Sequence, residues 1–480
     1  MWGYEMSINK KCQVFTPHEY VQKLLDYVGY ANDLYNKKVA ENSCGDGNVL
    51  VEIVNRYIID CLNHGLSTLE IKLGLERDIY AAEIDQNHIN NCTCKLNALV
   101  GKYGIVDVKW NIYNGDFLKL NVTAEFDYVI GNPPYITYKE ISMGNRVFLR
   151  GEYETCYHGK FDYCYAFIEA SIKSLKNNGK LAYLVPSNIF KNQFAKSLRE
   201  YIIEDLTDIY DFTSEKLFKD KLTASSIIIY EANSGRDHLN YHNVLLEKSR
   251  IAPKKGLVGK WRFDDIVAIE NTKRFGDFFH AASSIATLLN SVYIIQDYSD
   301  NGKYIIKNGD KIEKNILRKA ISPRSMRYQK KEYIIFPYNY QDNNLVRFSE
   351  EQFAERFPMT TEYMLKFKTK LDKRDSDKGI NWFEYGRSQA LVHLNQSKLL
   401  LSTLVTNQVY VYSLDEKDIP TSGIYIVKKD KYDLEIAKNI LESPEFYSYV
   451  QSIGVISNAN SYRIAPKDIN NFLIPKKYLK

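Results

Sequence analysis

The sequence predicts an α/β protein whose N-terminal half folds as a doubly wound, mostly parallel sheet. Short apolar runs alternate with longer helical stretches through this half, which is the pattern of strands joined by crossover helices. Acidic or amide side chains follow several of these runs directly, and a polar segment at 231–237 ends the alternation. Because open sheets of this class bind ligands at the carboxyl ends of their strands, the pattern also predicts where the functional site lies.

The elements of the predicted sheet follow in order along the chain. Short apolar runs predict strands at 38–41, 79–84, 106–112, 126–130 and 180–185. Stretches with helical spacing of apolar residues predict helices at 18–28, 49–63, 88–99, 163–175 and 193–205. Two further strands, at 208–212 and 225–230, are close in sequence and predict an antiparallel excursion at the edge of the sheet.

The chain is too long for one compact core, so we expect two domains. Its 480 residues divide at the polar segment 231–237, which gives a first domain at 1–235 and a second at 245–480. Beyond the division, strand-like pieces mix with helical stretches, and we therefore expect a mixed α/β second domain. The strand-like pieces are at 333–337, 409–412 and 423–427, and the helical stretches are at 350–357 and 432–443.

The composition excludes several classes of protein. Hydrophobic content of 45% and charged content of 26% are globular values, and a net charge of +5 permits a nucleic-acid partner without requiring one. No apolar run approaches the roughly 18 residues of a membrane span, and the first residues lack the character of a signal peptide. The 7 Cys form no disulfide framework, and Cys92 and Cys94 have no second pair at zinc-like spacing. We expect a reduced, cytoplasmic protein with no membrane contact and no metal.

Acidic side chains follow three successive predicted strands. Glu41 ends the first strand and precedes a turn that contains Gly45 and Gly47, Glu83 ends the second, and Asp116 lies just after the third. Glycines at a strand-to-helix turn let the backbone approach a ligand closely, and an acid after the second strand can accept from ribose hydroxyls. The turn has neither a third glycine nor a Gly-Lys-Ser/Thr sequence, so the predicted ligand is a nucleoside with no phosphate to cradle.

The fourth predicted strand ends in the tetrapeptide Asn132-Pro133-Pro134-Tyr135. Two consecutive prolines cannot continue a strand, because neither donates to a sheet ladder. The tetrapeptide is therefore a rigid turn that presents an amide, a fixed carbonyl and an aromatic ring together. Such a set suits a planar amine, since both oxygens accept from one NH₂ group and the ring stacks on the heterocycle that carries it.

The order of these motifs resembles that of the γ-class N6-adenine DNA methyltransferases, whose cofactor motifs come first and whose target-recognition domain follows. The resemblance is specific from residue 11 to about 230 and looser through the second half. At the glycine turn the family usually has Asp-Pro-Ala-Cys-Gly-Ser-Gly, so here Glu41 keeps the acid and Asp46 replaces the serine. The motifs that carry the resemblance are Gln13-Val14-Phe15-Thr16-Pro17, Ser43-Cys44-Gly45-Asp46-Gly47, Glu83, Asp116-Phe117, Asn132-Pro133-Pro134-Tyr135 and Leu217-Phe218-Lys219-Asp220.

The resemblance implies S-adenosylmethionine as the cofactor, held at the strand ends of the first domain. Glu83 would bind its ribose and Asp116 the amine of its adenine, with the ring of Phe117 beside it. The other residues that the resemblance assigns to the cofactor, at its methionine end, are Phe15, Thr16, Pro17, Glu41, Cys44, Gly45 and Gly47.

The resemblance also implies a target adenine that is flipped out of the duplex, because a stacked and paired base is out of reach. The side-chain oxygen of Asn132 and the carbonyl of Pro133 would accept from N6 and direct its lone pair toward the methyl group. Tyr135 and Phe218 would stack on the two faces of the base. Positioning and electrostatics would then supply most of the rate.

The second domain is then expected to bind double-stranded DNA and to read its sequence. Basic runs at 318–319, 323–331 and 366–374 interleave with aromatic residues and are candidates for phosphate contacts, although such runs are often only solvated faces. We expect methylation alone, with any cleavage left to a separate restriction endonuclease. The alternatives are a protein glutamine N5-methyltransferase, an RNA adenine methyltransferase, and a non-catalytic DNA-binding module with a degenerate cofactor pocket.

Overall fold

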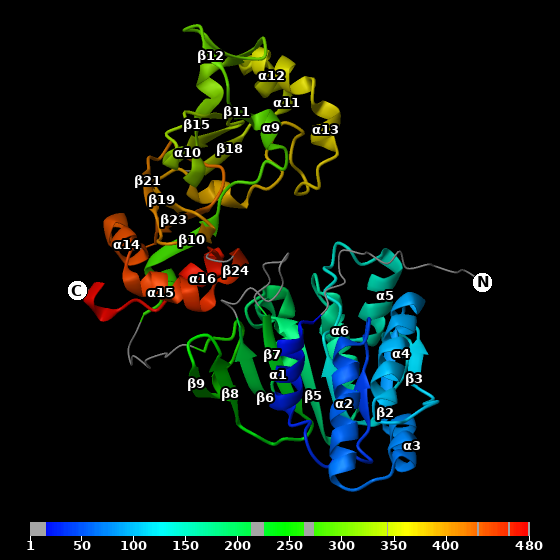
Figure 1. Ribbon diagram of the computed structural model, residues 1–480. Coiled ribbons are helices and arrows are strands. Elements are labelled where there is room, and N and C mark those ends of the chain that lie inside the picture. The colour runs from blue at the N-terminus through cyan, green and yellow to red at the C-terminus, as the bar shows by residue number, and fades with distance from the viewer. Residues whose placement is uncertain are drawn as a thin grey trace. The chain divides into compact units, whose positions relative to one another are not determined.

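The computed structural model (Figure 1) describes residues 16–212, 225–263, 273–342, 344–429, 432–458 and 461–478. The chain divides into two compact units, Met1–Asp264 (unit 1) and Asp265–Lys480 (unit 2). Phe15 and Phe218, which the family resemblance assigns to the cofactor and to the target base, lie outside the described residues.

Unit 1 is built on one large sheet, to which the described residues contribute nine strands in the order β3-β2-β1-β4-β5-β7-β6-β8-β9. β1 pairs in parallel with β2 and β4, whereas β7 runs antiparallel between β5 and β6. The strand order reverses between β1 and β4, so their carboxyl ends form the switch point at which such sheets bind ligands. The strands are β1 Val39–Glu41, β2 Ile79–Glu83, β3 Asn111–Asn114, β4 Phe126–Gly131, β5 Leu175–Pro186, β6 Leu206–Asp211, β7 Ser225–Glu231, β8 His238–Asn243 and β9 Lys248–Pro253.

Helices cover both faces of this sheet, which confirms the predicted doubly wound, mostly parallel architecture. On one face α1, α2 and α4 pack together, and Leu24 and Ile53 join a core cluster with Val39 of β1 (Figure 1). On the other face α6 contributes Phe167 to a second cluster, together with Val129 of β4. The helices are α1 His18–Val28, α2 Asn48–Asn63, α3 Thr68–Asp78, α4 Gln86–Gly101, α5 Met143–Glu152, α6 Tyr163–Ser174 and α7 Lys196–Ile202.

Two local predictions were wrong. The strand expected at 106–112 begins only at Asn111, because Val106 is 64% exposed and Asp107 adopts a left-handed backbone with φ of 54°. Residues 68–78, for which no helix was predicted, form α3, which a capping box between Ser67 and Glu70 starts.

The sheet of unit 1 continues past the polar segment at 231–237. β8 pairs in parallel with β6, and β9 pairs antiparallel with β8, so the division between the units falls after Asp264 rather than between 235 and 245. For the same reason the antiparallel β7 lies inside the sheet and not at its edge. The pairing of β6 with β8 skips over β7, and the local sequence pattern carries no signal for it.

Unit 2 contains several small sheets packed with short helices, which is the mixed α/β content expected of it. The larger sheets have the orders β10-β23-β19-β21 and β11-β16-β15-β22. The strands are β10 Phe279–Ser283, β11 Ile294–Ile295, β12 Ser299–Asp300, β13 Tyr304–Lys307, β14 Asp310–Glu313, β15 Leu317–Ile321, β16 Tyr333–Ile335, β17 Tyr338–Gln341, β18 Asn344–Arg347, β19 Lys398–Leu401, β20 Leu404–Val405, β21 Val411–Leu414, β22 Ile419–Pro420, β23 Ile424–Lys428, β24 Val455–Asn458 and β25 Ser461–Arg463. The helices are α8 Phe275–Phe278, α9 Asn290–Tyr293, α10 Pro323–Arg327, α11 Glu350–Arg356, α12 Pro358–Leu365, α13 Lys368–Asp372, α14 Leu434–Leu441, α15 Pro444–Ile453 and α16 Pro466–Asn470.

Two separate hydrophobic clusters stabilise unit 2. One contains Ile334 of β16 with Phe353 and Tyr385, and the other contains Phe279 of β10 with Leu401 of β19. Over the residues described in both units, no helix has the length and apolar character needed to cross a bilayer.

Candidate cofactor and substrate site

The turn after β1 lies at the switch point of the sheet and is tightly folded. Gly45 and Gly47 have φ of 49° and 82°, in the left-handed region that favours glycine. A Cβ added to Gly47 would lie 2.4 Å from Sγ of Cys92 in α4, so the turn packs directly against that helix. Cys44, in the same turn, is buried.

Glu83 at the end of β2 holds this turn in place. Its Oε2 accepts a hydrogen bond from the backbone N–H of Gly45 at 2.9 Å, and its Oε1 accepts from the N–H groups of Ile84 and Asp85 at 2.9 Å each. A carboxylate offers about four lone-pair positions. One lone-pair position on Oε2 therefore remains for a ligand, and the three hydrogen bonds already fix the orientation of the Glu83 side chain.

Glu41 at the end of β1 is a buried carboxyl group, only 2% exposed. Its Oε2 has no hydrogen-bond partner in the protein. Burial raises the pKa of this carboxyl group well above its ordinary value, and the neighbouring Cys92 and Glu83 raise it further. An unpartnered buried oxygen of this kind fits a cationic ligand group, since an ammonium beside it would supply both the missing hydrogen bond and a compensating charge.

Asp46, which departs from the family pattern, has its own partners on α4. His88 Nδ1 lies 2.5 Å from Asp46 Oδ1, and Asn91 Nδ2 donates to the same oxygen at 3.3 Å. Lys95 Nζ donates to the backbone carbonyl of Asp46 at 2.8 Å. Burial opposes ionisation of Asp46, but the hydrogen bonds from His88 and Asn91 outweigh it and lower the pKa of the carboxyl group. The added charge is thus matched within the fold.

The turn at 132–135 follows β4 and connects to the segment before α1. Asn132 Nδ2 donates to the hydroxyl oxygen of Thr16 at 3.1 Å, and the Ser43 hydroxyl donates to the Asn132 carbonyl at 3.2 Å. Thr16 is only 5% exposed, and Pro17 after it leads into α1. These bonds join three segments that are far apart in sequence: the start of α1, the glycine turn and the 132–135 turn.

The aromatic residue of this turn is anchored through its hydroxyl group. Tyr135 Oη lies 2.5 Å from Asn132 Oδ1 and 2.7 Å from the carbonyl oxygen of Leu184 in β5, so its single proton serves two acceptors. Burial raises the pKa of the Tyr135 hydroxyl well above its ordinary value, which keeps it protonated. Pro133 is buried, whereas Pro134 and Tyr135 are partly exposed.

Asp116 and Phe117 lie after β3, at the start of a single short 3-10 turn, Phe117–Lys119. Asp116 Oδ1 caps this turn by accepting from the Leu118 N–H at 3.0 Å, and its Oδ2 accepts from the Tyr163 hydroxyl at 3.2 Å. No α-helix connects β3 to β4 in this described segment, so the sheet face beside it lacks the usual helical cover.

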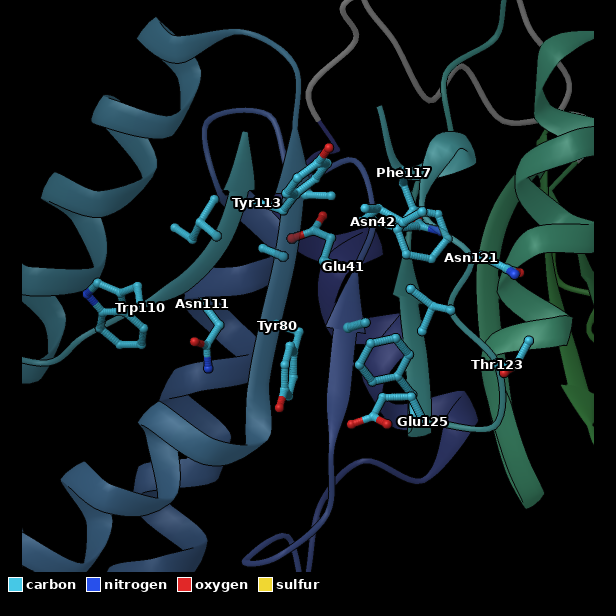
Figure 2. Close-up of a pocket in the computed structure, with 17 residues that line it drawn as sticks. Glu41, Asn42, Tyr80, Trp110, Asn111, Tyr113, Phe117, Asn121, Thr123 and Glu125 are labelled. Carbon is cyan, nitrogen blue, oxygen red and sulfur yellow. The ribbon is translucent and has the colours of Figure 1, made fainter. Parts of the chain in front are cut away.

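A cavity of about 720 Å³ occupies this uncovered face. Figure 2 shows Glu41, Asn42 and Phe117 at one end of the cavity and Glu125 at the other, with Tyr80 of β2 between them. The cavity therefore extends from the carboxyl ends of the strands down the face of the sheet.

The structure brings together most of the described residues that the sequence selected for the site. Thr16, Glu83 and Asn132 are linked directly or through the glycine turn, whereas Asp116 bonds to Tyr163 of α6 instead. Sequence reasoning missed a buried network under β1, in which Asn42, Ser171 and Tyr183 are mutually hydrogen-bonded. The distances in this network are 2.7 Å from Asn42 Nδ2 to Ser171 Oγ, 2.5 Å from Tyr183 Oη to Asn42 Oδ1 and 2.7 Å between the two hydroxyls.

Sequence reasoning also missed His88, the partner of Asp46. The sequence carried one signal for this pair: Asp46 is an acid where the resembling family has serine, and such an acid needs a counter-charge nearby. The glycine turn and the start of α4 both follow neighbouring parallel strands, so their side chains meet at the same edge of the sheet.

Comparison with known proteins relates unit 1 to the class of protein that its sequence resembles, the DNA methyltransferases. Residues 55–218 match the Eco57I restriction-modification methylase family. The chain is 24% identical over 478 residues to the type II restriction enzyme and methyltransferase RM.Eco57I of Escherichia coli, covering 80% of this chain and 47% of that protein. It is 25% identical over 276 residues to the type II methyltransferase M.PaeR7I of Pseudomonas aeruginosa, covering 53% of this chain and 46% of the relative. The chain thus spans about half the length of these relatives.

Solved structures share the fold over both units. The type IIL restriction-modification enzyme MmeI, determined in complex with DNA, aligns with a TM-score of 0.62 over 95% of this chain and 64% of its own, at 12% identity. A nuclease-deletion mutant of the type ISP enzyme LlaGI, in complex with a DNA substrate mimic, aligns with a TM-score of 0.55 over 92% of this chain and 52% of its own. The likeness to these solved structures concerns the fold, and the match to the Eco57I restriction-modification methylase family covers residues 55–218 of unit 1.

Proposed function

We propose that the chain is a site-specific DNA methyltransferase that transfers a methyl group from S-adenosylmethionine to N6 of adenine in double-stranded DNA. The observation that carries this proposal is the hydrogen-bonded connection of the 132–135 turn to Thr16 and to the glycine turn beside the buried carboxyl of Glu41. A group that accepts from an amine thus lies next to a pocket suited to a cationic nucleoside.

The residues present fit S-adenosylmethionine. The unpartnered Oε2 of Glu41 would accept from the ammonium of its methionine portion, and the free position on Oε2 of Glu83 would accept from a ribose hydroxyl. Asp116 keeps acceptor capacity for the adenine amine, because each of its oxygens receives one hydrogen bond from the protein. When bound, the cofactor supplies an electrophilic methyl group on its sulfonium. Cys44, Gly45 and Gly47 would lie against its methionine end.

The acceptor pair on the 132–135 turn would hold the target amine. Asn132 Oδ1 and the Pro133 carbonyl would each accept one N6 hydrogen, which leaves the amine lone pair directed toward the methyl group. Asn132 Oδ1 has a second lone pair available beside the Tyr135 hydroxyl. No strong base is required for this arrangement, because the amine becomes acidic only as the new bond forms. The chain would contribute orientation and exclusion of water.

The target base would have to leave the duplex to reach this turn, at a cost of a few kcal/mol. The ring of Tyr135, anchored at its hydroxyl, would offer one stacking face, worth roughly 1–3 kcal/mol per base. Phe218 remains the proposed second face. DNA as substrate is supported by the family match of unit 1 and by the names of the relatives. We propose unit 2 as the recognition domain, because MmeI, solved in complex with DNA, aligns over 95% of this chain.

A separate restriction endonuclease remains the proposed partner for cleavage, although one relative is named as both restriction enzyme and methyltransferase. We expect the purified chain to methylate DNA and, with Mg²⁺ present, to leave unmodified DNA intact. Double-strand cleavage by the purified chain would contradict this part of the proposal.

The central test is Asn132→Ala, compared with Asn121→Ala as a matched control from the exposed rim of the cavity. We expect Asn132→Ala to keep S-adenosylmethionine binding by calorimetry and to lose at least ~100-fold in methyl transfer, because the amine is no longer positioned. Asn121→Ala should behave as wild type. The readout is transfer of labelled methyl to duplex DNA, to RNA and to protein substrates.

Each alternative has its own outcome in this experiment. Label that appears only in protein would favour a glutamine N5-methyltransferase, and label only in RNA would favour an RNA adenine methyltransferase. Failure of the wild-type chain to bind S-adenosylmethionine would favour the non-catalytic module.

A further inference from the structure

Unit 2 carries a cluster of exposed cations on the connection between β15 and β16. The cluster, which we call the α10 patch, consists of Lys319, Arg324, Arg327, Lys330 and Lys331. β15 and β16 are antiparallel neighbours, and Lys319 pairs in register with Tyr333. The two ends of the connection therefore lie side by side, and all five cations gather at one end of this strand pair.

The backbone that carries these cations is firmly held. Ser322 and Ser325 form a capping box at the start of α10, with distances of 2.8 and 2.9 Å from each backbone nitrogen to the other hydroxyl oxygen. Ser325 is only 2% exposed, and the Lys330 N–H donates to its carbonyl at 2.9 Å. The N–H of Thr421 also donates to Ile321 at the end of β15. The cations thus project from a rigid turn rather than from a loose loop.

The charge of the α10 patch is not neutralised within the described part of the chain. None of its five side chains forms an ion pair with a described residue. Residues 319–332 contain five cations and one acid, Glu332, which leaves a net charge of +4, and Glu332 accepts from Gln296 instead. Tyr328, 61% exposed, adds a hydroxyl donor to the same surface.

The second basic run, at 366–374, is different because three of its five cations have partners within unit 2, whereas Lys370 and Lys373 are exposed. Lys366 forms an ion pair with Asp310, and Lys368 forms one with Asp372. Four of the five N–H groups of the Arg374 guanidinium are used inside the unit, where they donate to the carbonyls of Leu371, Thr287 and Trp382 and to the hydroxyl of Tyr293.

We propose that the α10 patch binds the phosphate backbone of duplex DNA and that the partnered cations of the 366–374 run, Lys366, Lys368 and Arg374, do not. This inference rests on the proposed function. Lysine and arginine side chains that point to water without acidic partners are the groups that replace condensed counter-ions on DNA, and such contacts position a protein without reading sequence. A cluster held on a rigid turn loses little backbone conformational entropy on binding, which favours its use as a fixed anchor.

The test is the salt dependence of binding to a duplex of arbitrary sequence, measured by fluorescence anisotropy on the full chain. Each phosphate contact contributes about 0.9 to the slope of log K against log salt concentration. The triple variant Arg324→Ala, Arg327→Ala, Lys330→Ala should therefore lower that slope by roughly 3 and weaken binding at low salt. The control, Lys366→Ala with Lys368→Ala, removes two cations that already have acidic partners and should keep the wild-type slope.

A second variant, Arg324→Lys with Arg327→Lys, keeps the charge and should keep the slope, which separates charge from misfolding. A wild-type chain that fails to bind duplex DNA would contradict the proposed function itself. A wild-type chain that binds while the triple variant keeps the full slope would overturn only the assignment of the α10 patch. The assignment would also be overturned if the control variant lowered the slope and the triple variant did not. The same holds if the triple variant lowered the slope for duplex RNA alone.

Discussion

At the scale of single residues, Asp46 shows how the chain accommodates a departure from the motif of the methyltransferases that it resembles. The acid sits in the glycine turn, and His88, Asn91 and Lys95 of α4 all contact it. These contacts join the turn after β1 to α4, the helix after β2. An acid in place of the neutral serine thus fastens the glycine turn to that helix.

We predict that Asp46 and His88 act together in positioning the glycine turn for the cofactor. Asp46→Ser and His88→Ala should each raise the Kd for S-adenosylmethionine by roughly fivefold, because each removes the same charge-assisted hydrogen bond. The double variant should have a Kd no higher than that of the single variant that binds more weakly, because the effects of substituting two residues in contact are not additive. Calorimetry on all four proteins completes the cycle, and fully additive losses would show that the two residues act independently.

At the scale of elements, the glycine turn and α4 depend on a close approach that only glycine allows. We predict that Gly47→Ala lowers the melting temperature and weakens cofactor binding, because its Cβ would meet Cys92 Sγ at 2.4 Å and its φ is 82°. The left-handed backbone costs about 1–2 kcal/mol and the overpacking about 1–3 kcal/mol more.

Gly29 provides the matched control for this prediction. It has a similar φ of 75° at the end of α1, but a Cβ there would meet no atom within 4 Å. Gly29→Ala should therefore show the backbone cost alone, measured by thermal unfolding. Equal losses in the two variants would mean that the contact with Cys92 is unimportant.

The sequence predicted those elements whose signals are local. The alternation of apolar runs and helical stretches located most strands and helices of unit 1, and the polar residues at the ends of β1, β2 and β4 marked one edge of the sheet. What it missed depends on contacts across the fold. Examples are the Asp46–His88 pair, the Asn42 network with Ser171, and the ion pair that joins Lys366 to Asp310.

At the scale of the whole molecule, the two units have separate hydrophobic cores. We predict that S-adenosylmethionine protects unit 1 from hydrogen exchange and leaves the cores of unit 2 unchanged. A ligand present at 100 times its Kd stabilises the state that binds it by about 2.7 kcal/mol, and the protection should centre on the strand ends near Glu41, Glu83 and Asn132. Exchange measured by mass spectrometry with and without the cofactor gives the readout. Protection confined to unit 2 would be incompatible with the proposed site.

The position of the boundary between the units also depends on long-range pairing. A polar segment at 231–237 resembles a linker in sequence, but β8 returns to pair with β6 and carries β9 with it. Composition alone cannot distinguish a turn within a sheet from a connection between units, because both are polar and rich in turn-forming residues.

The missing helical cover between β3 and β4 has a consequence for inhibitor selectivity. The cavity that it leaves begins beside Glu41 and Phe117 and continues past Tyr80 to Glu125 (Figure 2). An adenosine analogue with an apolar extension would gain contact area along this face, and a basic end group would share the Glu125 carboxylate with its ion-pair partner Lys38. A methyltransferase whose sheet is covered there by a helix would exclude the extension by steric overlap. Selectivity for this chain would then come from the sheet face rather than from the cofactor pocket.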